Sequence, residues 1–242
     1  MGRVNYNYKD RYLLTVSARY DGSSRLAPGH KWVLFPSAAL AWRVKEESFL
    51  KDVDCLSNLK LRLGWGITGN TAIDPYKTQG SLEYGRYSYG SNGVLAFYQK
   101  EMPNPNLSWE KTEQWNAGID FGFLNNRITG SLDYYYRETN DLISRIPVPA
   151  GSNLTNEIYT NVGRLRNEGI EFNIQAKVID NKDFTWDLGM NVAWNSNKIT
   201  KLNKSESADY YIPVGGIGGG TGNTVQAHKV GYPAYSLSLI HI

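Results

Sequence analysis

"KTEQWNAGIDFGFLNNRITGSLDYYYRE", residues 111–138, alternates apolar and polar side chains along two runs that are separated by the turn "LNNR". The apolar positions are Trp115, Ala117, Ile119, Phe121 and Phe123 in the first run and include Ile128, Leu132, Tyr134 and Tyr136 in the second. Successive side chains of a strand point to opposite faces, so this stretch predicts a hairpin with one apolar face and one polar face. A soluble protein would bury the apolar face in a core, whereas a membrane barrel would expose it to lipid.

The same alternation recurs along most of the chain and predicts about eight strands. Their apolar faces span residues 4–8, 12–20, 32–44, 59–67, 115–123, 128–136, 170–178 and 184–194. None of the alternate positions that make up these faces is charged, although charged residues are frequent on the opposite faces. Several runs are longer than the five or six residues usual for strands of soluble proteins, which favours a membrane barrel over a soluble β-sandwich.

The connections between these strands alternate in length. Residues 9–10, 125–126 and 180–183 form tight connections and 45–58 a moderate one, while 21–31, 68–111, 139–166 and the chain from about 197 form long ones. In an up-and-down barrel this order places the short turns at one end and the long loops at the other, as in outer-membrane barrels. Aromatic residues also gather near both ends of the strands, where amphipathic rings would meet the two membrane interfaces. Residues 46–52 are compatible with a short helix at the short-turn end.

Composition excludes several classes of protein. The 242 residues include 41% hydrophobic and 20% charged residues, and no apolar run approaches the length of a membrane helix. The net charge of +3 comes from basic and acidic residues mixed along the chain, so there is no clustered footprint for nucleic acid. Cys55 is the single cysteine, which rules out an internal disulfide and makes a cysteine-based zinc site implausible.

The two faces of the predicted strands give two sets of candidate residues. We expect lipid to be met by Leu61, Trp65, Trp115, Ile119, Leu132, Ile174 and Leu188. We expect the lumen to be lined by Arg62, Asp120, Asp133, Glu171 and Asp187.

Several motifs resemble those of the SusC/RagA family of TonB-linked outer-membrane proteins. They are "GRVNYNYKDRYLLTVSARYDGSSR", "GWGITGN", "NPNLSWEKTEQWNAGIDFGFLNNRITGSLDYYYRETNDLI" and "NVGRLRNEGIEF", and together they extend over roughly residues 2–203 in the order that the family shows. The resemblance implies an all-β fold, with eight or nine strands of a 22-stranded antiparallel, up-and-down transmembrane barrel. Residues 1–236 would then be a segment from the second half of that barrel.

The family resemblance also implies partners and a cellular location. It implies import of oligosaccharides or peptides, a SusD-like surface lipoprotein as lid, and TonB acting through an N-terminal plug region. The location would be the outer membrane of a Gram-negative, Bacteroidetes-like bacterium, in contact with membrane lipid and lipopolysaccharide. The chain starts without a plug, TonB box or signal peptide, and "LSLIHI" (237–242) does not continue the family pattern. We therefore expect both ends to be truncations, with residues 237–242 a truncated or non-native tail.

The longest predicted loop carries candidate ligand-binding residues. Aromatic side chains lie there among Gly, Ser and Asn, namely Tyr84, Tyr87, Tyr89, Phe97 and Tyr98. Such surfaces suit sugar rings, peptides or a protein partner, because aromatic side chains supply contact area at low entropic cost. The same rings could instead pack the loop against itself or against the barrel rim.

Other motifs have simpler interpretations. The stretch "VGGIGGGTGN" (214–223) lacks the Gly-Lys-Ser/Thr ending of a phosphate-binding loop and is interpreted as a flexible loop. Asp52 and Asp54 lack the ligand spacing of a calcium loop, and the sequon at residues 153–155 is short enough to arise by chance. We predict no catalytic residue, no metal site and no cofactor.

These observations favour the wall and outer loops of an importer. A passive porin or an adhesin would share the alternation and the aromatic bands, and would be distinguished by the lack of a plug and TonB box in its upstream sequence. A soluble β-sandwich enzyme is the third interpretation, and it predicts a chain that folds in water without detergent.

Overall fold

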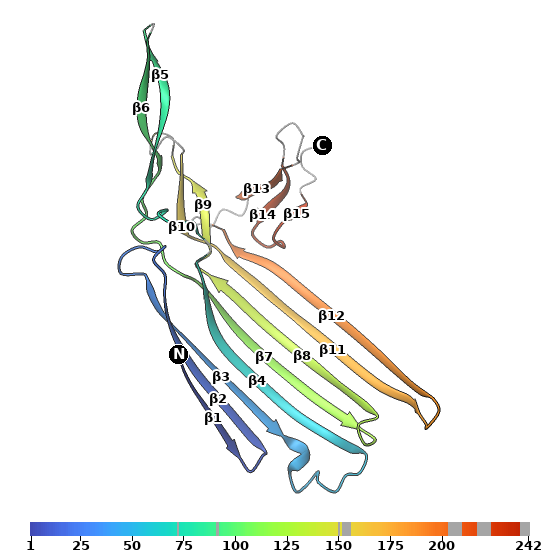
Figure 1. Ribbon diagram of the computed structural model, residues 1–242. Coiled ribbons are helices and arrows are strands. Elements are labelled where there is room, and N and C mark those ends of the chain that lie inside the picture. The colour runs from blue at the N-terminus through green and yellow to red at the C-terminus, as the bar shows by residue number, and fades with distance from the viewer. Residues whose placement is uncertain are drawn as a thin grey trace.

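The chain forms one long antiparallel sheet with smaller β-elements at one end (Figure 1). The computed structural model describes residues 1–71, 73–90, 92–149, 151, 156–202, 210–216 and 224–237. The sequon at 153–155, most of the Gly-rich stretch and residues 238–242 of the expected tail lie outside this described part.

The main sheet has eight strands in the order β1-β2-β3-β4-β7-β8-β11-β12. Their bounds are β1 Gly2–Tyr8, β2 Tyr12–Gly22, β3 Trp32–Arg43, β4 Leu56–Asn70, β7 Glu110–Phe123, β8 Ile128–Asn140, β11 Arg164–Asp180 and β12 Thr185–Lys201. All neighbours pair antiparallel and follow one another in the chain, apart from small hairpins inserted between them. The prediction of an all-β, up-and-down arrangement of about eight strands is therefore confirmed.

Short and long connections lie at opposite ends of this sheet, as the sequence predicts (Figure 1). The tight turns use residues with left-handed backbone, among them Lys9 and Asp10 with φ of 54° and Asn126 with φ of 60°. Asparagine and aspartate tolerate this conformation better than most residues because their short side chains bond locally. Left-handed backbone at these residues thus lets the chain reverse direction within the short connections.

Additional strands form at the long-connection end and were not predicted. A hairpin of β5 (Ser81–Tyr89) and β6 (Asn92–Glu101) projects away from the sheet, and β9 (Ile143–Pro147) pairs with β10 (Glu157–Asn161) (Figure 1). A third small sheet contains β13 (Tyr211–Gly216), β14 (Thr224–Lys229) and β15 (Ser236–Leu237). Three of the long connections therefore contain small β-sheets of their own, separate from the main sheet.

The helix expected at residues 46–52 is displaced and shorter. The structure has a 3-10 helix, η1, over Val44–Glu46, followed by one hydrogen-bonded turn in which the Lys51 amide donates to the Glu47 carbonyl at 2.9 Å. The Lys45 ammonium donates to the carbonyls of Leu50, Lys51 and Val53, so a side chain holds this connection together where a longer helix was expected.

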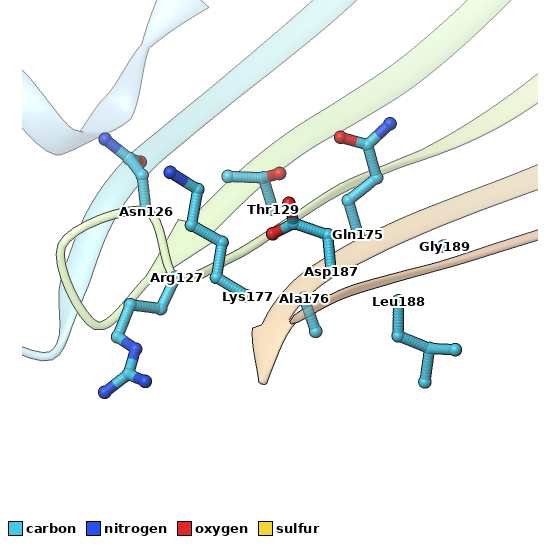
Figure 2. A pocket seen from close by; sticks show the side chains of 9 residues that line it. All are labelled: Asn126, Arg127, Thr129, Gln175, Ala176, Lys177, Asp187, Leu188 and Gly189. Atoms are coloured by element: carbon cyan, nitrogen blue, oxygen red, sulfur yellow. The ribbon is translucent and has the colours of Figure 1, made fainter. Parts of the chain in front are cut away.

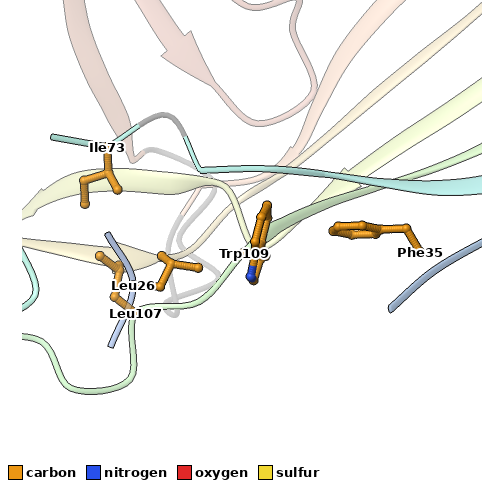
Figure 3. Packing of buried hydrophobic residues seen from close by; sticks show 5 residues of the cluster. All are labelled: Leu26, Phe35, Ile73, Leu107 and Trp109. Carbon is orange, nitrogen blue, oxygen red and sulfur yellow. The ribbon is translucent and has the colours of Figure 1, made fainter. Parts of the chain in front are cut away.

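Very little of the molecule is buried. Its accessible surface is 16626 Å², against about 10,900 Å² for a compact monomer of this mass. The buried hydrophobic cluster lies at the long-connection end and contains Leu26, Phe35, Ile73, Leu107 and Trp109 (Figure 3). The sheet itself has no layer packed on either face among the described residues. The open sheet therefore resembles one part of a larger β-structure.

Candidate functional site

The strand register separates the two predicted sets of residues onto opposite faces of the sheet. One continuous row runs Trp42, Leu61, Ile119, Leu132, Phe172 and Val192 across six strands. The neighbouring row on the other face runs Ala41, Arg62, Gly118, Asp133, Glu171 and Ala193. We call the first face, which includes all seven residues predicted to meet lipid, the apolar face, and the second the polar face.

No other described part of the chain forms a layer over the apolar face. Large side chains that would be buried in a soluble protein are exposed here, such as Leu63 at 58%, Leu188 at 56% and Trp115 at 53%. Exposed apolar area on this scale marks a surface that meets another apolar phase or partner.

A carboxylate accepts hydrogen bonds from two aromatic side chains at each end of the apolar face. At the long-connection end, the indole nitrogens of Trp65 and Trp115 donate to Glu113 Oε1 at 2.9 and 3.1 Å. At the short-turn end, Tyr12 OH and Trp42 Nε1 donate to Glu47 Oε1 at 2.7 and 3.1 Å. Each carboxylate thereby orients a pair of rings whose polar atoms point away from the centre of the face.

The polar face carries an ion network centred on Arg62. The guanidinium makes a bidentate contact with Asp120, with Nε to Oδ2 at 2.9 Å and Nη2 to Oδ1 at 2.7 Å, and Nη2 also reaches Asp133 Oδ1 at 2.8 Å. Lys60 Nζ lies 3.7 Å from Asp120 Oδ2. Bidentate pairing fixes the planar guanidinium in one orientation. Two cations and two carboxylates are therefore held in one place on three adjacent strands, β4, β7 and β8.

Gly118 makes this geometry possible. It lies between Arg62 and Asp133 in the row across β4, β7 and β8, and a Cβ at this position would lie 2.8 Å from Arg62 Nη2 and closer still to Asp133. Without a side chain here, the arginine can reach across one strand to the second carboxylate. By contrast, a Cβ at Gly64 on the same face would have its nearest neighbour, in Asn116, at 3.9 Å.

The other two predicted polar-face residues do not join this network. Glu171 pairs in register with Asp133 and is exposed, and Asp187 lies opposite Lys177 near the short-turn end. Asp187 lines a hollow of about 380 Å³, where Asn126, Thr129, Gln175 and Lys177 point to the same side (Figure 2). A second hollow of about 260 Å³ lies beside Arg62, over a floor of small residues, Ala39, Ala41, Gly64 and Gly118.

The five aromatic residues predicted to bind ligand lie on the β5–β6 hairpin but on both of its faces. Tyr84 pairs with Phe97 on one face, with ring centroids 6.5 Å apart. Tyr98 pairs with Glu83 on the other face, and Tyr87 and Tyr89 follow Glu83 at alternate positions on that face. Tyr84, Tyr87, Tyr89 and Phe97 are each more than 60% exposed. The hairpin therefore presents two aromatic surfaces rather than one.

The two surfaces differ in polarity. Beside Tyr84 and Phe97, the first carries Leu82 and Leu95, which are 73% and 60% exposed, and a single charged residue, Arg86, which pairs with Leu95. On the second, Glu83 accepts hydrogen bonds from Lys100 at 3.0 Å and from Tyr98 OH at 3.0 Å. These bonds, first that from Lys100 and then that from Tyr98, lower the pKa of the Glu83 carboxyl below its usual range. We call the first the apolar surface and the second the tyrosine surface of the hairpin.

A packed base joins the long-connection end of the sheet to the β9–β10 hairpin. Trp109 packs edge-on against Phe35 with ring centroids 5.4 Å apart, and its indole donates to the Lys31 carbonyl at 3.0 Å. Asn161 on β10 donates to the Ser108 carbonyl and accepts from the Ser108 amide at 2.8 Å, which ties β9–β10 to the segment before β7. None of these residues was predicted as functional, because Phe35 occupies a polar-face position of β3 and the others lie in long connections, where the sequence shows no two-residue period.

Among the described residues, no group of three or more His, Cys, Asp or Glu side chains could hold a metal ion. No helix in that part of the chain has both the length and the apolar character needed to cross a membrane.

Comparison with known proteins places this sheet in a family. The family described as "TonB dependent receptor-like, beta-barrel" matches residues 1–239. The chain belongs to the TonB-dependent receptor β-barrel family.

Relatives of this TonB-dependent receptor β-barrel segment agree in sequence and in structure. It is 50% identical over 244 aligned positions to the TonB-dependent receptor SusC of Bacteroides thetaiotaomicron, covering 97% of this chain and 24% of that protein. It is 39% identical to the TonB-dependent receptor P3 of Formosa agariphila, covering 83% of this chain and 20% of that receptor. The segment thus spans about a quarter or less of the length of these curated relatives.

Solved structures show the same fold. The structure of the RagAB peptide transporter matches with a TM-score of 0.80 and 29% identity, over 96% of this chain and 24% of that chain. The RagAB peptide importer in its "closed-closed" state matches equally well, with a TM-score of 0.80 and 30% identity. The resemblance to SusC/RagA proteins expected from the sequence is confirmed, and the open sheet is a partial barrel of a TonB-dependent receptor.

Proposed function

We propose that the full-length parent of this segment imports oligosaccharides or peptides across a bacterial outer membrane, driven through TonB. The segment would form part of the barrel wall and of the outer loops. The observation that carries the proposal is a two-faced antiparallel sheet of eight strands in a chain that belongs to the TonB-dependent receptor family. A closed barrel satisfies its backbone groups between strands, so it can cross lipid without helices.

The apolar face would meet the acyl chains, through residues such as Leu61, Leu132 and Ile174. On β8, Ile128 and Tyr136 are eight positions apart, which corresponds to about 27 Å of strand. With the usual strand tilt this is about 20 Å along the membrane normal, close to the ~25 Å apolar band of outer-membrane barrels. The ring pairs held by Glu113 and Glu47 would then lie at the two interfaces, where aromatic residues are enriched.

The polar face would line the lumen. The network of Arg62, Asp120 and Asp133 gives this wall a fixed pattern of charge without a large net charge. We propose that it contacts a plug contributed by the part of the parent outside this segment, and that Glu171 and Asp187, exposed on the same face, affect what passes.

The β5–β6 hairpin would act outside the membrane. An isolated two-stranded hairpin is only marginally stable in water, so two exposed aromatic surfaces favour partners on both. We propose that the apolar surface around Tyr84 and Phe97 contacts a SusD-like lipoprotein. The tyrosine surface, with Tyr87, Tyr89 and Tyr98, would contact substrate, because hydroxyls and a charged pair suit sugar or peptide groups.

Growth and uptake would test the transport proposal. The gene for the parent would be deleted and restored, and growth measured with oligosaccharides or with peptides as the sole carbon source. We expect one of the two substrate classes to require both the parent and an intact TonB system. Uptake that needs the parent but not TonB would indicate a passive porin, and surface attachment without any uptake would indicate an adhesin.

Paired hairpin variants would test whether the apolar surface contacts the lipoprotein and the tyrosine surface contacts substrate. Tyr84→Ala with Phe97→Ala should reduce the amount of lipoprotein that copurifies with the parent, while Tyr87→Ala with Tyr89→Ala should weaken substrate binding to the purified complex. Each pair is the control for the other because both remove two exposed rings. Equal losses of lipoprotein in the two pairs would contradict the assignment of surfaces.

A further inference from the structure

Four cations form a compact group on the apolar-face side of β11 and β12, at the long-connection end. In the strand register, Arg166 lies opposite Lys198 and Arg164 lies opposite Lys201. Neighbouring strands are about 4.8 Å apart, so the four side chains start from adjacent backbone positions. We call this group the cation quartet.

The carboxylates near the quartet do not balance its charge. Glu138 Oε1 lies 3.5 Å from Arg164 Nε, and Glu168 Oε2 lies 2.5 Å from Arg166 Nη2. Lys198 and Lys201 are exposed, and neither makes an ion pair with a carboxylate of the described residues.

The two arginines also keep free donor capacity. Their side chains remain 50% and 42% exposed for Arg164 and Arg166. Arg166 Nε has no hydrogen-bond acceptor among the described residues, but this atom is buried, so only the exposed part of the guanidinium is open to a ligand. With two carboxylates against four cations, the group has an excess positive charge and too few acceptor oxygens.

The position of the quartet indicates what could supply those oxygens. Trp194 is an exposed ring on the apolar face, and Lys198 follows it by four residues on the same strand. Four residues correspond to about 13 Å of strand, or about 10 Å along the membrane normal for a tilted strand. Because Trp194 lies near the end of the apolar zone, the quartet lies just beyond it, at the level of lipid head groups.

We propose that the cation quartet binds the phosphate groups of a phosphorylated lipid in the outer leaflet. This inference rests on the proposed membrane function, since it requires the apolar face to meet lipid. Arginine pairs with phosphate through its planar fork, and lysine adds a compact point charge. Arg166 also stacks on Tyr136, with its Cζ 4.8 Å from the ring centroid. This contact and the bond from Nη2 to Glu168 fix the guanidinium, so Arg166 adds positive charge beside the two exposed lysines rather than a free fork.

Lipid binding to the purified parent provides the test. Full-length parent in neutral detergent would be stripped of lipid and titrated with diphosphorylated lipid A, and bound lipid would be counted by native mass spectrometry. Each basic residue near a charged membrane surface contributes about a fivefold change in affinity. We therefore expect Lys198→Gln with Lys201→Gln to weaken lipid A binding by roughly 25-fold.

The matched control removes two cations at a similar level on the polar face. Arg3 and Arg137 belong to one row there, through Ser17, Ser37, Gly66 and Gln114. Arg3→Gln with Arg137→Gln should leave lipid A binding within twofold of the unmodified parent. Equal weakening by both pairs, or no weakening by the lysine pair, would overturn the proposal.

Further measurements distinguish lipid phosphate from free phosphate, and distinguish failure of the lipid-binding proposal from failure of the transport proposal. Lipid A without phosphates should bind the parent at least as weakly as diphosphorylated lipid A binds the lysine variant, because that variant keeps both arginines. Inorganic phosphate that binds as tightly as lipid A would overturn the lipid assignment. A parent that binds lipid A through the lysines but imports nothing would refute the transport proposal alone. A parent that imports substrate but shows no dependence on the lysines would refute the quartet alone.

Discussion

Replacing Leu132 with arginine should destabilise the full-length parent by about 2–4 kcal/mol, because it places a charge at the middle of the proposed apolar band. Leu132 is 42% exposed on β8 and lies four residues from both Ile128 and Tyr136. That spacing corresponds to about 10 Å of membrane depth on each side. An arginine side chain at this depth has to extend toward an interface, or draw water and head groups inward, to keep its charge hydrated.

The adjacent residue gives the control. Ser131→Arg introduces the same side chain on the same strand, but Ser131 pairs with Asp120 and Asn173 on the polar face. In a water-filled lumen the new charge stays hydrated, so we expect a change within about 0.5 kcal/mol. Tyr136→Arg, near the interface, should cost about 0–1 kcal/mol because the penalty falls with distance from the midplane.

The measurement is the denaturant midpoint of the refolded parent in lipid vesicles, followed by tryptophan fluorescence and by the mobility shift of folded barrels on gels. The three variants together then show how the stability penalty depends on membrane depth and which face of the sheet meets lipid. A neutral Leu132→Arg together with a costly Ser131→Arg would refute the assignment of lipid to the apolar face. Equal penalties at positions 132 and 136 would indicate a protein core in place of a bilayer, because a core has no such depth dependence.

Three further predictions concern the network, the interface carboxylate and the sheet edges. Gly118→Ala should lower the unfolding free energy of the parent by about 1–2 kcal/mol, because the new methyl group would separate Arg62 from Asp133. Gly64→Ala should be nearly neutral, because there is space for a methyl group at that position. Equal effects of the two substitutions in chemical denaturation would contradict the network. The hydrogen bond from Tyr12 is the main cause that lowers the pKa of Glu47 below its usual 4.5, so its stabilising contribution is present above pH 4.5 and is lost as the pH falls through the lowered value. The stability difference between the parent and its Glu47→Gln variant, measured from pH 7 to pH 3, should therefore shrink on acidification, and a constant difference would disprove the linkage. Finally, the isolated segment should self-associate in detergent-free buffer because β1 and β12 leave unpaired edges; a monodisperse monomer in sedimentation would count against the open sheet.

The eight long strands were predictable because one face of each carries apolar side chains at every second position. The strand register and the side-chain contacts were harder to predict from the sequence. The sequence assigned Arg62, Asp120 and Asp133 to one face, but their meeting depends on how β4 pairs with β7 across the inserted β5–β6 hairpin. The opening at Gly118 that lets Arg62 cross a strand also has no sequence signal, because glycine is common elsewhere in the sheet.

The β5–β6 hairpin was missed for a different reason. Tyr84 and Phe97 lie on one face and Tyr87 and Tyr98 on the other, so the stretch lacks a polar face and the two-residue period disappears. The buried base escaped prediction in a similar way. Phe35 occupies a position on the polar face of β3, where the alternation assigned no core residue, and its partner Trp109 comes from a connection.

Charged residues bracket the apolar face, and this has a consequence for how the sheet would sit in a membrane. Glu113, Glu138 and Arg166 form one row across β7, β8 and β11 at the long-connection end, and Glu47 lies beyond the opposite end. Between them, the apolar-face positions of the eight strands carry no charge except Glu168, which lies in the row of Trp115 and Tyr136 and is ion-paired with Arg166. A shift of the sheet by one pair of residues along a strand, about 5 Å of depth after tilt, would either submerge that row of charges or expose apolar side chains to water. The ion pairs and the ring pairs held by Glu113 and Glu47 would therefore restrict the proposed wall to one depth in the bilayer.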